Sequence, residues 1–95
     1  MAANRSPAVL VLVGPIEPQD IPELCRRARG LVERSDAELV VCDVRALAQP
    51  DAVAVEALAR VRLTVRRQGR RVRIRHSCRD LRELLAFMGL ADILR

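Results

Sequence analysis

The chain contains no lysine, tryptophan or tyrosine, and its single phenylalanine is Phe87. Proteins that hold single-stranded nucleic acid stack its bases on several aromatic side chains, so the composition argues against that function. All seventeen basic residues are arginine, and the net charge is +5. A compositional bias of the encoding genome explains an all-arginine chain as readily as a functional demand does. We therefore give the net charge little weight and expect no nucleic-acid partner.

Long hydrophobic runs are also missing. No apolar stretch approaches the roughly 18 residues that are needed to cross a membrane. The first 14 residues hold too short an apolar segment and too little positive charge for a secretory signal. We therefore expect a cytoplasmic protein that does not insert into a membrane. The three cysteines, Cys25, Cys42 and Cys78, are odd in number and far apart, which argues against a disulfide framework and a CxxC zinc site. We expect them to be reduced core residues.

Glycine-rich phosphate-binding loops are absent, so we expect no nucleotide site and no cofactor. The four glycines are isolated and lie at predicted ends of helices and strands: Gly14, Gly30, Gly69 and Gly89. His76 and Cys78 flank the start of the last predicted helix, where a base and a thiolate can pair. The sequence supplies neither an orienting third group nor an oxyanion site, and a loop histidine with a packed cysteine is the simpler interpretation.

Two carboxylates lie next to a predicted strand and a predicted helix, on the same edge of the predicted sheet. Asp43 lies near the end of a buried strand, and Asp51 comes directly before a helix. Ligands often bind at this rim of an α/β sheet, but the pair has no pocket signature, and capping with loop ordering explains it. We expect no catalytic residue, no metal ligand and no enzymatic activity.

Hydrophobic periodicity predicts an α/β domain in which strands and helices alternate. The strands cover residues 8–13, 38–44 and 72–75, and the first helix covers 21–33. The second helix begins after Asp51 and stops at Gly69, and the third is capped by Ser77 and stops at Gly89. Residues 90–94 form a final half-turn. Short links predict parallel strands joined by right-handed crossovers, with helices chiefly on one face, in a single domain over 1–95 with an ordered core over 8–94.

Three local patterns refine this prediction. The uninterrupted apolar run at 8–13 predicts a central strand covered on both sides. Asp20 and Glu23 form a D-x-x-E capping box for the first helix. Residues 71–75 alternate strictly, which points the arginines at 71, 73 and 75 away from the core.

The least usual segment is the start of the second helix. After Asp51, the first turn consists of Ala52, Val53 and Ala54. A helix N-terminus normally carries polar chemistry, and this one is apolar.

These residues resemble a known family. The residues in question are, in order, Asp43-Val44-Arg45, Asp51, a long helix ending in Gly69, a strand VRIR, and Ser77 followed by the RELLAFMGL helix. This series is similar to a STAS domain, the module of anti-sigma factor antagonists and of sulfate-transporter tails. The resemblance covers residues 8–94. It implies a small domain with a mainly parallel four-stranded sheet. The family's N-terminal extra strand is short or missing here, since only seven residues precede Ala8.

In phosphorylation-switched members the second aspartate precedes Ser/Thr-Ser/Thr-Gly, and a kinase that is also an anti-sigma factor modifies the second hydroxyl. The resemblance places Asp51 at this aspartate, Ala52 at the first hydroxyl, Val53 at the phosphorylated residue and Ala54 at the glycine. Valine cannot carry a phosphate, so the usual switch is absent.

Two functional classes follow from the resemblance. The first is an anti-sigma factor antagonist that binds a kinase-like anti-sigma factor. The second is the STAS subunit of a larger assembly, such as a lipid-transporting ABC transporter, which packs on its ATPase; a homodimer is also left open. The expected partner-binding residues are Asp43, Asp51, Ala52, Val53, Ala54, Val55 and Glu56. Packing of Val53 under the loop at 45–50 is an equally simple explanation for its apolar character.

An arginine cluster remains without a role in this prediction. Seven arginines fall between residues 62 and 75 and form either an electrostatic footprint for nucleic acid or acidic lipid, or a solvated face: Arg62, Arg66, Arg67, Arg70, Arg71, Arg73 and Arg75. The solvated face is the simpler interpretation.

Overall fold

The computed structural model describes residues 6–47 and 50–94. Strands and helices alternate along the chain: β1 (Ala8–Val13), α1 (Ile21–Glu33), β2 (Leu39–Ala46), α2 (Ala52–Arg67), β3 (Arg71–Arg75) and α3 (Arg79–Phe87). Two 3-10 turns, η1 (Pro18–Asp20) and η2 (Ala91–Leu94), precede α1 and follow α3. The predicted order and type of the elements are confirmed, and β2 continues beyond its predicted end.

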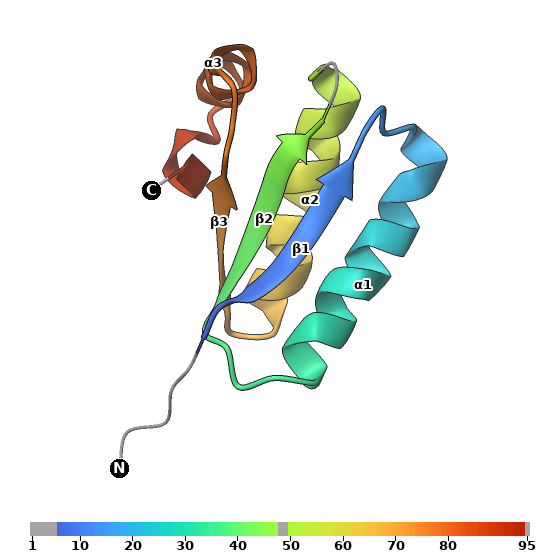
Figure 1. Cartoon of the computed structure of the whole chain (residues 1–95), viewed down its shortest axis with the longest axis vertical. Helices are drawn as coiled ribbons and strands as arrows, with labels where there is room; N and C mark the ends of the chain where they lie inside the picture. Colours follow the sequence, from blue (N-terminus) through green and yellow to red (C-terminus); the bar gives the residue numbers. More distant parts are fainter. Residues whose placement is uncertain (1–5, 48–49, 95) are drawn as a thin grey trace.

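The three strands form one parallel sheet in the order β1-β2-β3. Because strands that follow one another in sequence are neighbours in the sheet, two right-handed crossovers carry α1 and α2 over the same face, as Figure 1 shows. The parallel sheet with helices on one face is confirmed. The expected fourth strand is not present among the described residues, since Ser6 and Pro7 before β1 lie outside any strand.

The core lies between the sheet and α2. Leu10, Cys42 and Ile74 lie side by side across the three strands and are almost fully buried. α2 covers them with side chains that have no exposed surface: Val55, Ala57, Leu58, Val61 and Val65. Burial of a leucine or valine side chain contributes about 1.5–3 kcal/mol each, so this helix is the main apolar cover of the sheet.

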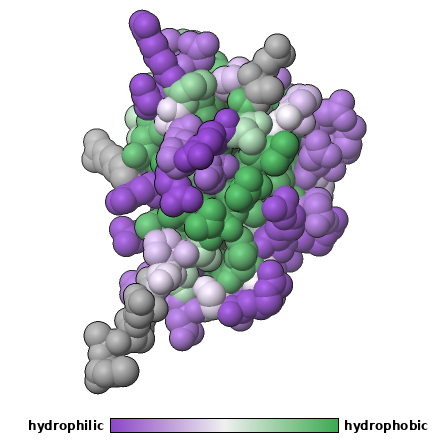
Figure 2. Space-filling view, viewed as in Figure 1, coloured by the Kyte–Doolittle hydropathy of each residue, from purple (hydrophilic) through white to green (hydrophobic). Residues whose placement is uncertain are grey.

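The opposite face of the sheet is open, and this corrects the prediction for the first strand. β1 is an edge strand of the described sheet, and Val9, Val11 and Val13 are 39%, 45% and 67% exposed. Figure 2 shows a hydrophobic area in the middle of this face with hydrophilic residues around it. The run at 8–13 is apolar on both sides of the strand, but only its helix-facing side is covered.

Both glycine helix stops are confirmed. Gly69 and Gly89 have φ of 76° and 78°, a left-handed conformation that glycine adopts without strain. After α2, the N–H of Arg70 donates to the carbonyl of Val65 at 3.2 Å, and the N–H of Gly69 donates to Arg66 at 2.9 Å. This pair of bonds satisfies carbonyl groups that the helix itself leaves free.

The first helix begins at Ile21 as predicted, but the side-chain caps predicted for the first and third helices are wrong. Asp20 Oδ2 accepts from the N–H of Glu17 at 2.9 Å, so its carboxylate closes the η1 turn and makes no cap bond to α1. The residue that caps α3 is Cys78 rather than Ser77. The chain turns directly after β3 through His76, whose φ is 65°, and the helix begins only at Arg79.

The cysteines have three different environments. Cys42 is buried, Cys25 is half-buried and packs against the core, and Cys78 is exposed. The prediction of core residues is therefore wrong for Cys78. None of the three is in a disulfide. No helix within residues 6–47 and 50–94 has the length and apolar character of a membrane span.

Thiol labelling tests this packing. In native buffer near neutral pH, a maleimide should modify Cys78 and leave Cys42 untouched, because Cys42 is inaccessible and its burial raises the thiol pKa to about 12. Peptide mass spectrometry after timed quenching gives the extent at each site, and labelling in denaturant is the control for intrinsic reactivity. Equal native rates at the two sites would show that the core is not closed around β2.

Candidate functional site

The apolar helix start identified in the sequence forms a well-defined turn at the N-terminus of α2. Asp51 is the N-cap in extended conformation, and its Oδ1 accepts from the N–H of Ala54 at 3.0 Å. The Asp51 carbonyl accepts from the N–H of Val55 at 3.1 Å, which is the first helical bond. The predicted cap is confirmed, and it accounts for the aspartate by helix chemistry alone.

The seven predicted partner-binding residues do not form one surface. Asp51, Ala52 and Glu56 are exposed, whereas Ala54 is only 3% exposed and Val55 is fully buried. Ala54 and Val55 therefore belong to the folding core and cannot contact a partner of the folded domain, which corrects that part of the prediction. The helical period explains this, because positions one turn apart share a face and the core face of α2 begins at Ala54.

Val53 lies between these two groups. Its side chain is half-buried and packs against the hydrophobic core. Leu47, from the segment before α2, is half-buried and packs on the same core. Packing thus accounts for part of the apolar character at position 53, and the remaining part of the side chain is accessible beside Ala52 and Glu56.

Asp43 lies on the open face of the sheet and not at the end of its strand. Its neighbours Cys42 and Val44 point toward the helices, so Asp43 points the other way, beside Val11 of β1 and Arg75 of β3. Asp51 caps a helix on the opposite face. The two carboxylates thus belong to different surfaces of the domain.

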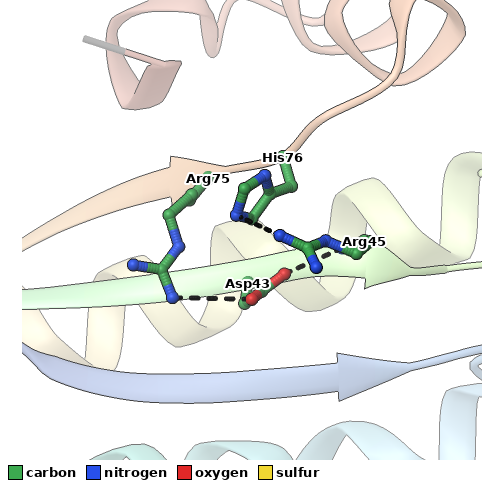
Figure 3. Close-up of polar contacts among 4 residues, drawn as sticks. All are labelled: Asp43, Arg45, Arg75 and His76. Carbon is green, nitrogen blue, oxygen red and sulfur yellow. Dashed lines mark hydrogen bonds and ion pairs between the residues drawn. The ribbon is translucent and has the colours of Figure 1, made fainter.

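Asp43 is the centre of a polar cluster that the sequence analysis did not identify. Its Oδ1 accepts from the N–H of Arg45 at 3.0 Å, and a guanidinium nitrogen of Arg75 lies 3.5 Å from Oδ2 (Figure 3). The guanidinium of Arg45 in turn lies 2.7 Å from His76 Nε2. The parallel register that pairs residue 43 with 75, together with the alternation at 71–75, is the signal from which this cluster follows.

The surroundings hold the pKa of Asp43 below its ordinary value. The hydrogen bond from the Arg45 N–H is the largest cause, partial desolvation opposes it, and the nearby side chains of His76, Arg45 and Arg75 act in the lowering direction. The carboxylate is therefore ionised at neutral pH and ties β2 to β3 on the open face. This role is structural, and the ionised carboxylate has no proton to donate as a general acid.

His76 and Cys78, the pair considered for base and thiolate chemistry, have different surroundings. His76 contacts Arg45, while Cys78 is the exposed cap of α3. Within the described part of the chain, no group of three His, Cys, Asp or Glu side chains is placed to hold a metal ion.

Neutralising Asp43 should lower stability in a pH-dependent way. Because its folded-state pKa is lowered, the stabilisation by the carboxylate is complete above the ordinary carboxyl range and is lost as the pH falls through the folded pKa. Asp43→Asn should therefore lower the melting temperature at neutral pH, and the difference from the parent protein should shrink in acid. Circular dichroism melts across that range measure it. Asp36→Asn, at an exposed position, is the control, and equal shifts in both variants at every pH would contradict the assigned role.

Comparison with known proteins agrees with this geometry. The family model described as "Mlab, STAS domain" matches residues 1–95, and no curated protein matches the sequence. STAS domains are in general non-enzymatic modules that mediate contacts between proteins. Since the match extends over the whole sequence, the chain belongs to the STAS domain family.

Proposed function

We propose that this protein is an interaction module of the anti-sigma factor antagonist type, which binds a kinase-like anti-sigma ATPase through the first turn of α2. The observation that carries the proposal is that this turn is exposed and apolar in its accessible part. Ala52 and Glu56 lie one turn apart on the helix surface, with the accessible part of Val53 beside them. Alanine and valine stand here at a helix start, where polar residues are usual, and their accessible part is available for an apolar contact with a partner.

The neighbouring surface extends this contact. A hollow of about 370 Å³ lies between α1 and α2, and it is lined by Pro18, Pro22 and Cys25 together with Glu56 and Arg60. Glu56 and Arg60 form an exposed ion pair at 3.4 Å, so the polar rim lies beside the apolar turn. A partner side chain that enters this hollow would be held close to the N-terminus of α2.

The proposed contact is not switched by phosphorylation of this chain. A phosphate at the first turn of a helix adds about 1.5–2 negative charges at the positive end of the helix dipole, which strongly changes any interface there. Position 53 is valine, and the remaining first-turn positions carry no hydroxyl either. Control would therefore come from the amount of protein present or from competition between partners.

A second candidate function is a structural subunit that packs on the ATPase of a lipid-transporting ABC transporter. The observation that favours it is the same turn, because a permanently assembled subunit has no need of a phosphorylatable hydroxyl. The half-buried position of Val53 against the core fits a surface that stays unchanged. The two candidates share the α2 surface and differ in the class of ATPase that binds it.

The contact is tested by placing a charge on each face of the domain. Val53→Asp and Ala52→Arg should weaken binding of the partner ATPase by at least tenfold, because a charge is then buried in an apolar contact. Val13→Asp makes the same kind of change at a 67% exposed position on the open sheet face and should leave binding unchanged. Biolayer interferometry against purified anti-sigma ATPases and ABC ATPases of the same cell measures the effect and distinguishes the two candidates.

The folding of each variant is checked by its melting temperature. Val53 is half-buried, so a loss of binding by Val53→Asp counts only if the variant still melts cooperatively. Ala52 is exposed and supplies the independent test. Retained binding by both variants would exclude the α2 surface.

The absence of the switch predicts the outcome of kinase assays. Incubation with a partner serine/threonine kinase should leave residues 39–69 unmodified, although Thr64 within α2 carries a hydroxyl. A chain carrying Ala52→Ser and Val53→Ser together with Ala54→Gly regains the family pattern and should be phosphorylated at position 53. Phosphopeptide mapping reports both results, and a phosphate on Thr64 of the parent chain would contradict the proposed mode of control.

A further inference from the structure

Five of the arginines in the cluster at residues 62–75 gather around one hollow at the outer edge of β3. The hollow measures about 430 Å³, and Leu39, Val72 and Ile93 form its apolar part. The arginines come from the last turns of α2, from the following turn and from alternate positions of β3: Arg62, Arg66, Arg70, Arg71 and Arg73. We call this the arginine pocket.

Part of the positive charge of the arginine pocket has no carboxylate partner among the described residues. Asp92 from η2 is the single carboxylate in its lining, and it is already paired with Arg62. Arg66, Arg70 and Arg71 have no ion pair with any residue in the described ranges. Like charges brought together around a partly apolar hollow repel one another, so an anion there removes an unfavourable interaction.

One buried donor in this pocket also lacks an acceptor. The Nε–H of Arg70 is enclosed and has no hydrogen-bond partner within the described part of the chain. A buried donor without a partner costs about 1–3 kcal/mol, so an oxyanion that draws the Arg70 guanidinium into a hydrogen bond recovers part of this cost. The helix dipole does not explain this arrangement, since it favours Arg66 and Arg67 near the C-terminus of α2 but requires nothing of Arg70 or of β3.

We infer that the arginine pocket binds an oligophosphate, meaning a group with two or more closely spaced phosphates. Guanidinium groups bind phosphate oxygens in pairs, and several converging on one hollow match several adjacent phosphates better than a single anion. An extended nucleic-acid strand spaces its phosphates along a groove, and the pocket offers no aromatic side chain to hold a base. Recognition therefore depends on the phosphates alone.

This site is separate from the proposed partner contact. The arginine pocket lies at the C-terminal end of α2, roughly 20 Å from its first turn at 1.5 Å per residue. The inference therefore does not depend on the identity of the partner ATPase. The oligophosphate can be a soluble compound or the headgroup of an anionic lipid, and these two sources share the chemistry that the pocket recognises.

Calorimetric titration of the folded protein with tripolyphosphate at physiological ionic strength tests the inference. We expect saturable binding that Arg66→Gln with Arg71→Gln weakens by at least tenfold. Arg67→Gln removes the same kind of charge from the same helix end but lies outside the pocket lining, and it should change the dissociation constant by less than about threefold. Arg70→Lys keeps the charge and removes Nε, and it should weaken binding although the net charge is unchanged.

A second experiment distinguishes a soluble oligophosphate from the headgroup of an anionic lipid. Flotation with phosphatidylcholine vesicles that do or do not contain cardiolipin, whose headgroup carries two phosphates, detects headgroup binding, and the same variants are compared there. Saturable binding to either probe that depends on the pocket arginines and not on Arg67 supports the site. Absence of binding to both probes, or equal losses in the pocket variants and in Arg67→Gln, would overturn it, with melting temperatures confirming that each variant is folded.

Discussion

The packing of α2 on the helix-facing side of the sheet is the interaction on which the other features depend. Val55, Leu58, Val61 and Val65 are fully buried along almost the whole length of this helix, against strand residues that lie in parallel register. Sequential strand order and right-handed crossovers place α1 beside it on the same face. As a consequence, one face of the sheet stays open, and both ends of α2 are carried to the surface at opposite edges of the domain.

The elements that were predictable from sequence are those determined by local chemistry. An aspartate cap and two glycine stops define both ends of α2 and the end of α3, because each satisfies backbone groups within a few residues. The side-chain cap of α1 and the start of α3 were not predictable in the same way, although α1 begins at Ile21 as predicted. Asp20 has two possible acceptor roles in consecutive turns, and the conformation of His76 determines where α3 begins.

The hydrophobic pattern of the sequence does not show which faces of the strands and helices are covered by other elements and which are exposed. The run at 8–13 is equally apolar on both sides, and nothing in it indicates that β1 is an edge strand with Val9, Val11 and Val13 accessible. The apolar turn at 52–54 likewise predicted a binding surface without separating buried Ala54 from exposed Ala52. The contact of Asp43 with Arg75 required the strand register, which sequence spacing alone does not give.

The two surfaces at the ends of α2 differ in chemistry and are joined by one helix. The N-terminal turn is small and apolar apart from its cap, whereas the C-terminal end faces a pocket of arginines. Two sites are coupled when a structural element between them has two discrete arrangements and binding at either site shifts the equilibrium between these arrangements. The buried face of α2 is continuous from Ala54 to Val65, so a shift of the helix would disturb the whole core rather than one end. Occupancy of the arginine pocket should therefore act through the position or charge of the whole domain, and not by reshaping the turn after Asp51.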